Sequence, residues 1–247
     1  MTHDILCIGA VLWDVIGRAS RPMAAGDDVP GRIARLPGGV AMNIAMTLAR
    51  MGMRPALLTA IGRDAAGDEL MAACAALGLI TDFIHRDPSL PTDIYMAIEG
   101  ENGLIAAIAD AHSLERAGDA ILAPLQDGRL GSAPAPYAGI VALDGNLTTD
   151  LLAQIAAAPA FARADLRLAP ASPGKAERLA PLLAHPRATL YVNLAEACLL
   201  AHGAFGTAHL AAEALVARGA HRVIVTNGAS PCADAGVGLP TLTAQPA

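Results

Sequence analysis

Polar side chains that could bind hydroxyl groups or a cation follow the ends of several predicted strands. In an open α/β sheet, ligands bind beyond the carboxyl ends of the strands, so we expect these side chains to gather along one edge. Carboxylates and amides without a basic cluster suit hydroxyl recognition and a hard cation such as Mg²⁺. The residues are Asp14, Asp144, Asn146, Asn193, Glu196, Thr226, Asn227 and Gly228.

A second candidate site begins at Gly38 and Gly39, just before a predicted helix that ends at Gly52. Two glycines let the backbone approach a ligand closely, and the first turn of a helix has free N–H groups. Asn43 lies one turn further on, where its amide could bind a diol. The alternative is a tight turn without a ligand. Helical spacing predicts one apolar face, formed by Val40, Ile44, Leu48 and Met51.

Structural roles compete with binding roles at two other positions. Asp14 follows an apolar run, and there it could simply cap a turn or helix. Asn193 and Glu196 have the spacing of a helix cap and its first-turn acid, which is the pattern of a capping box. Both alternatives stay open from the sequence alone.

The order of predicted elements favours an α/β fold. The continuous apolar run at residues 5–11 is typical of a buried strand, and from residue 139 onward strands and helices alternate. This alternation predicts a mostly parallel sheet with helices on both faces. Residues 15–36 and a hairpin at 93–109 are expected to form a small separate sheet.

Composition excludes several classes of function. The 247 residues are 54% hydrophobic and 16% charged, with a net charge of −6 from 17 basic and 23 acidic residues. With 3% aromatic residues and no basic run, the chain lacks the pattern of a nucleic-acid-binding protein. The four cysteines are too scattered for a zinc site. No signal peptide or membrane-length apolar run occurs, so we expect a cytoplasmic protein without a membrane partner.

Two motifs resemble those of a known family. Gly38-Gly39-x-x-x-Asn43 resembles the first signature of the ribokinase-like (PfkB) carbohydrate and nucleoside kinases, and Asn193-Leu194-Ala195-Glu196 resembles their N-x-x-E motif. Both occur in the family's order along the chain. Within the family, the segments 107–110, 143–146 and 170–175 are most similar to pseudouridine kinases.

The resemblance implies a fold and a set of site residues. The fold is a single three-layer α/β/α, Rossmann-like domain over residues 1–247, with a β lid from about 15–36 and 92–110. Substrate-binding roles are implied for Asp14, Gly38, Gly39, Asn43, Asp110 and Asn146. ATP-binding roles are implied for Asn193, Thr226 and Gly228, and a metal-binding role for Glu196. Asp110 and Asn146 could equally be solvated loop residues.

The implied activity is ATP-dependent phosphorylation of the 5′-hydroxyl of a nucleoside or pentose, with pseudouridine as the first candidate. ATP, Mg²⁺ and a monovalent cation are the implied cofactors, and lid-to-lid homodimers are frequent in the family. The family's catalytic base is the Asp of a Gly-Ala-Gly-Asp motif, which does not occur in these 247 residues. We therefore predict no catalytic residue and expect a C-terminally incomplete domain. The alternatives are a kinase for another sugar and a truncated, non-catalytic relative that only binds the ligand.

Overall fold

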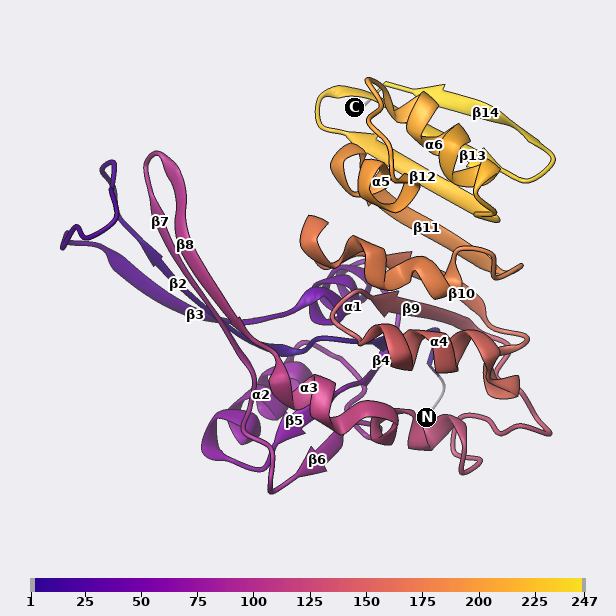
Figure 1. The fold of residues 1–247 in the computed structure, drawn as a ribbon. Coiled ribbons are helices and arrows are strands. Elements are labelled where there is room, and N and C mark those ends of the chain that lie inside the picture. The colour runs from indigo at the N-terminus through magenta and orange to yellow at the C-terminus, as the bar shows by residue number, and fades with distance from the viewer. Residues whose placement is uncertain (1–2, 246–247) are drawn as a thin grey trace. The chain divides into compact units, whose positions relative to one another are not determined.

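The computed structural model describes residues 3–245, and their contacts divide the chain into two compact units (Figure 1). The first unit is Gly9–Ile121 together with the N-terminal residues up to His3. The second is Asp4–Ile8 together with Leu122–Ala247. Each unit is described by itself below, and the expectation of a single domain stays a prediction.

The second unit is built on a large, mostly parallel sheet, as predicted. Its strands lie in the order β14-β13-β12-β11-β10-β9-β1. The parallel members are apolar and largely buried, as expected for strands that helices cover. They are β1 (Ile5–Ile8), β9 (Ile140–Asp144), β10 (Asp165–Ala169), β11 (Ala188–Asn193) and β12 (Arg222–Asn227). Two antiparallel strands complete it, β13 (Ser230–Gly236) and β14 (Leu239–Ala244).

Three α-helices of this unit begin at the side-chain caps that the sequence offers. Thr148 accepts a hydrogen bond from Leu151 N at the start of α4 (Thr149–Ala157), and Thr207 does the same for Leu210 N at α6 (Ala208–Ala217). Asn193 caps α5 (Leu194–Ala201). Residues Pro173–Leu182 form a 3₁₀ helix, η3, which contains Pro181.

The first unit contains a four-stranded sheet that we call the lid sheet, with strand order β3-β2-β7-β8 (Figure 1). Its strands are β2 (Leu12–Arg18), β3 (Arg32–Gly38), β7 (Ile94–Gly100) and β8 (Gly103–Asp110). The sheet therefore joins the early segment to the hairpin, as the sequence predicted. The rest of the unit contains β4 (Pro55–Leu58), β5 (Ala60–Gly62), β6 (His85–Asp87), α1 (Val40–Arg50), α2 (Ala65–Ala76) and α3 (His112–Ala117).

The predicted apolar face of α1 is only partly buried. The helix fully buries Ala41, Met42 and Ala45. On the predicted face, Val40, Ile44 and Leu48 are half-buried, and Met51 is 75% exposed. Met42 lies against the Cys74 thiol of α2, with 3.8 Å between the two sulfur atoms. Small alanines on that side let the helix pack closely on its neighbours. Gly52 ends the helix as predicted, with a φ of 88°.

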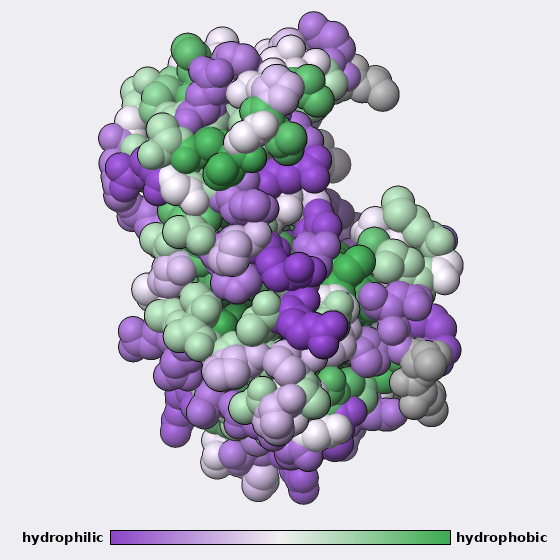
Figure 2. All heavy atoms as spheres, turned by 90° about the vertical axis from the view of Figure 1, so that its right-hand side faces the viewer, coloured by the Kyte–Doolittle hydropathy of each residue, from purple (hydrophilic) through white to green (hydrophobic). Residues whose placement is uncertain are grey.

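Apolar residues are also exposed in the second unit. Leu239 and Leu242 of β14 are 61% and 63% exposed. In the upper part of Figure 2, at the height where Figure 1 has β13 and β14, apolar spheres lie among hydrophilic ones.

Among residues 3–245, no helix is both long enough and apolar enough to span a membrane.

Candidate functional site

The half-buried carboxylate of Asp14 lies against the backbone of Gly38 in the first unit. Asp14 was expected just beyond the first strand, but the chain turns at residues 9–11 and places it inside lid strand β2. A Cβ atom at position 38 would overlap the Asp14 carboxylate, so only glycine fits there. Burial raises the pKa of Asp14 above its usual value. Its carboxylate has no hydrogen-bond partner among the described residues. A ligand whose hydroxyl donates a hydrogen bond would therefore stabilise the charged form.

Gly39 brings the start of α1 close to the Ala10 backbone. It caps the helix with a φ of 93°, and a Cβ atom at this position would collide with the Ala10 carbonyl oxygen. The helix follows at once, and Met42 N donates to that same oxygen at 3.3 Å. Asn43 is exposed one turn into the helix, and no described residue binds its side-chain amide. The glycine turn therefore fixes the helix start near β2 and leaves Asn43 able to bind a ligand.

Strand register separates Asp110 from Asp14. Asp14 pairs with Tyr95 of β7, and Tyr95 pairs with Ala109 of β8, so these three share one face of the lid sheet. Asp110 is the next residue along β8, and side chains alternate between faces along a strand. It is exposed and pairs with His112, with 2.8 Å between Oδ1 and Nδ1. The structure does not bring these two predicted residues together, and the substrate role of Asp110 stays a prediction.

Asn146 follows β9 in the second unit and is nearly buried, at 8% exposed. Its N–H donates to Asp144 Oδ1 at 2.7 Å, which forms a tight turn at the strand end. Its side-chain oxygen accepts from Lys175 Nζ at 2.7 Å, and its carbonyl accepts from Arg178 at 3.3 Å. Asn146 is therefore held by its neighbours rather than solvated, and a basic side chain lies beside it.

Asn193 and Glu196 form the capping box that was the structural alternative. Glu196 N donates to Asn193 Oδ1, and Asn193 N donates to Glu196 Oε2, both at 2.9 Å. The Glu196 side chain is thereby fixed at the carboxyl end of β11, only 7% exposed. This contact occupies one carboxylate oxygen and no described residue binds the other, so the cap leaves room for a binding role.

Thr226 and Gly228 lie where β12 turns into β13. Asn193 pairs with Thr226 in the β11–β12 register, so the predicted residues of these two strands share one edge of the sheet. Gly228 has a φ of 56° in the two-residue turn that the pair Asn227 and Ser230 closes. The predicted gathering of polar residues at the carboxyl ends is thus confirmed within the second unit.

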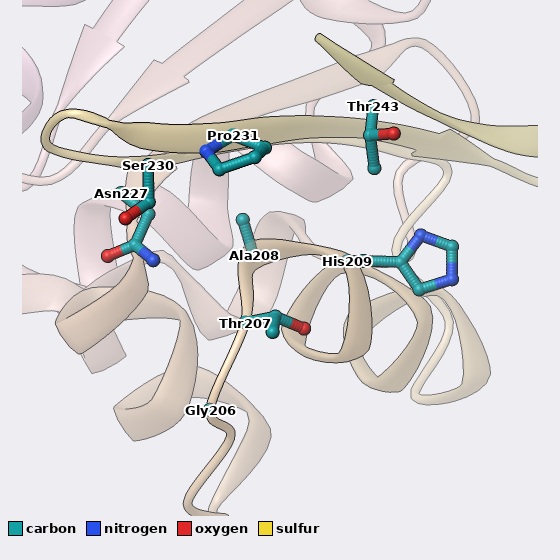
Figure 3. A pocket seen from close by; sticks show the side chains of 8 residues that line it. All are labelled: Gly206, Thr207, Ala208, His209, Asn227, Ser230, Pro231 and Thr243. Carbon is teal, nitrogen blue, oxygen red and sulfur yellow. The ribbon is translucent and has the colours of Figure 1, made fainter. Parts of the chain in front are cut away.

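A cavity of about 350 Å³ lies beside this turn (Figure 3). Asn227 and Ser230 lie close together at one end of it, and His209 and Thr243 at the other. Ala208 lies between, at the start of α6. The lining combines small residues with hydroxyl, amide and imidazole groups and has no carboxylate: Gly206, Thr207, Ala208, His209, Asn227, Ser230, Pro231 and Thr243.

The donor set for a cation is sparse. Among residues 3–245, no group of three or more His, Cys, Asp or Glu side chains is arranged to hold a metal ion. One buried carboxylate, Glu196, does fit Mg²⁺, because this ion usually keeps several waters and needs only one or two carboxylates beside substrate phosphates. The residues therefore suit an ion that a ligand brings with it.

The sequence analysis did not identify two aspartates at the base of the lid sheet. Asp64 caps α2 through Gly67 N at 2.7 Å and accepts from Thr92 N at 2.9 Å, just before β7. Asp93 is 4% exposed and accepts from Ser113 N and Leu114 N at 3.0 and 3.1 Å, just after β8. An N-cap pattern signals Asp64, but the partners of Asp93 are about twenty residues away in sequence and leave no local signal.

Comparison with known proteins agrees with this geometry. Residues 2–238 match the model of the pfkB family carbohydrate kinases. The pseudouridine kinase of Escherichia coli is 33% identical over 107 residues, which cover 43% of this chain and 34% of that protein. The pseudouridine kinase of Arabidopsis thaliana is 31% identical over 100 residues, or 40% and 26%. The chain thus spans about a third or less of these relatives.

Solved structures support the same fold. A carbohydrate kinase from Agrobacterium tumefaciens superposes with a TM-score of 0.80 at 25% identity, covering 99% of this chain and 76% of that one. An Arabidopsis thaliana ribokinase, solved with ribose and ATP, gives 0.75 at 18% identity, with 99% and 78% covered. The fold is ribokinase-like. The chain belongs to the pfkB family of carbohydrate kinases, which are phosphotransferases.

Proposed function

We propose that this protein phosphorylates the 5′-hydroxyl of a nucleoside or pentose with ATP, and that pseudouridine is its substrate. The observation that carries the proposal is the half-buried, unpartnered Asp14 carboxylate against Gly38. Withdrawing a carboxylate from water costs free energy unless hydrogen bonds replace those to water, and sugar hydroxyls can donate them. Similarity to two pseudouridine kinases favours pseudouridine over a free pentose.

The sugar side of the proposed site is in the first unit. Asp14 would accept hydrogen bonds from two hydroxyls, and the Asn43 amide would bind from the first turn of α1. Gly38 and Gly39 would hold that carboxylate and the helix start in place, and a direct contact of either glycine with the substrate stays a prediction. Phosphoryl transfer depends mainly on positioning the attacking hydroxyl and neutralising charge. Hydrogen bonds that fix the sugar would therefore increase the rate of the transfer. Asn146 is in the second unit, and its substrate-binding role stays a prediction.

The nucleotide side is in the second unit. The cavity beside the Asn227–Ser230 turn has the amide and hydroxyl groups that recognise a nucleotide without a charged residue. Thr226, Gly228 and Asn193 would line the phosphate end of ATP. Glu196 would hold Mg²⁺ through water. When bound, this ion neutralises part of the negative charge of the phosphates. A monovalent cation is a further proposed ion.

Calorimetry with pseudouridine, uridine, ribose and adenosine tests the substrate. Pseudouridine is expected to bind most tightly, and ADP release with ATP and Mg²⁺ tests turnover. A different sugar as the tightest ligand would favour a kinase of another specificity. Binding without turnover would favour a ligand-binding relative, and binding of none of the four would overturn the sugar site.

We also propose a homodimer through the lid sheet. Large apolar side chains are exposed on the face opposite Asp14, among them Ile33 at 81% and Ile108 at 70%. A second copy of the same surface would bury them without requiring a different partner. Sedimentation should show a dimer for the natural chain and a monomer for Ile108→Lys. A monomer for both proteins would overturn this arrangement.

A further inference from the structure

One row of residues crosses all four strands of the lid sheet at Asp14. Strand register pairs Leu36 of β3 with Asp14 of β2, Asp14 with Tyr95 of β7, and Tyr95 with Ala109 of β8. Side chains that face each other across neighbouring strands share one face of the sheet, about 5 Å apart. The ring of Tyr95 is therefore the immediate neighbour of the Asp14 carboxylate.

Contacts on the other face support this placement. Trp13 and Val15 flank Asp14 along β2, so their side chains lie on the opposite face. Arg35 of β3 pairs with Val15 and shares that face. The Arg35 guanidinium lies 3.9 Å from the centre of the Trp13 ring, so these side chains share the face opposite Asp14. Tyr95 is thus separated from the Trp13–Arg35 pair and stands with the unpartnered carboxylate.

The side chain of Tyr95 is not fixed by a polar contact or a ring contact. It is half-buried, and neither its ring nor its hydroxyl has a ring contact or hydrogen bond within the part of the chain that the structure describes. Its neighbours on the same face differ between the two sides of β7. Ala107 and Ala109 lie on the β8 side, and Asp14 and Ile16 lie on the β2 side. The Tyr95 ring therefore has small side chains on one side and a carboxylate on the other.

We propose that Tyr95 is a specificity-determining residue whose ring stacks on the planar base of a nucleoside held through its hydroxyls by Asp14. The inference rests on the proposed function and deepens it, because it names the residue that would distinguish a nucleoside from a free pentose. The hydroxyls and the base of a nucleoside are attached to one small ring, so their separation is comparable to the spacing between neighbouring strands. A base on a sugar held at Asp14 would therefore reach the Tyr95 ring. Aromatic side chains stack on any base, since every base has a π-face.

Binding of pseudouridine and ribose to Tyr95 variants tests the proposal by calorimetry. Tyr95→Ala should weaken pseudouridine binding by roughly 10-fold to 100-fold, the range found for loss of one stacked base, with little change for ribose. Tyr95→Phe keeps the flat ring and should retain pseudouridine affinity. Tyr95→Leu keeps apolar bulk without the flat ring and should lose affinity as the alanine variant does; it reports on stacking even if Tyr95→Ala does not fold.

Tyr191→Ala is the matched control, because it removes an exposed tyrosine from β11 in the second unit, and both affinities should stay unchanged. Equal losses for pseudouridine and ribose, or no loss for either, would overturn the role of Tyr95 and leave the proposed function standing. If the natural chain binds neither ligand, the proposed function itself fails, and the role of Tyr95 with it.

Discussion

The two units place their candidate residues in different ways. In the second unit, the residues follow the carboxyl ends of parallel strands, so topology alone brings Asn193 and Thr226 to one edge. In the first unit, Asp14 lies in the middle of a lid strand, and its neighbours depend on register and on which face each side chain occupies. An error of one residue in a predicted strand end leaves the following residues at the same edge of the sheet. A shift of one residue in the register of a lid strand, in contrast, moves every side chain to the other face.

The sharpest test of this comparison replaces the two lid aspartates. Asp14→Asn should lower nucleoside affinity by about 100-fold, because hydrogen bonds to a charged group contribute roughly 1.5–3 kcal/mol. Asp110→Asn should have a much smaller effect, since register places Asp110 on the opposite face. Calorimetry measures both, and equal losses would show that the face assignment is wrong.

The glycine turn gives the next largest effect. Gly39→Ala should lower the free energy of unfolding by about 2 kcal/mol, because it combines a left-handed backbone with a collision at the Ala10 carbonyl. Gly52→Ala is the control, since Gly52 has a φ of 88° but nothing within 4 Å of a new Cβ. It should cost about 1 kcal/mol. Urea denaturation measures both, and equal costs would contradict the close approach.

In the second unit, the helix-capping role of Glu196 can be separated from its proposed Mg²⁺-binding role. Glu196→Gln keeps an acceptor for Asn193 N but removes the charge, so stability should change little while the Mg²⁺ concentration needed for ATP binding rises about 10-fold. Asn193→Ala removes the cap and should cost about 1 kcal/mol of stability. Thermal unfolding and Mg²⁺ titration measure the two effects. An unchanged Mg²⁺ dependence in Glu196→Gln would leave Glu196 with the cap alone.

The smallest expected effect is a pH dependence of sugar binding in the first unit. Burial raises the pKa of Asp14, so its charge is lost at a higher pH than for an ordinary aspartate. Ligand affinity should therefore fall as pH decreases through that raised pKa. Protonation removes the charge but leaves a carboxyl group that still donates and accepts hydrogen bonds, so we expect a smaller loss than any of those above. Calorimetry across pH 4–8 measures it, and the same slope in Asp14→Asn would assign the effect to another group.

The sequence by itself determined the α/β class, the lid sheet and the residues of the second unit's edge. Apolar strand runs, turn glycines and the order of elements are local signals, and a parallel sheet converts that order into a shared edge. The capping box at Asn193 was also foreseen as an alternative, because its three-residue spacing is local.

Only the tertiary structure decided which faces meet. The sequence predicted one apolar face on α1, whereas packing buries the side with Ala41 and Ala45 most deeply. The sequence could not show that Asp14 lies inside a strand beside Tyr95, nor that Asp93 caps α3 from about twenty residues away. Register and close approach depend on contacts between segments far apart in the chain, and no single segment carries that information.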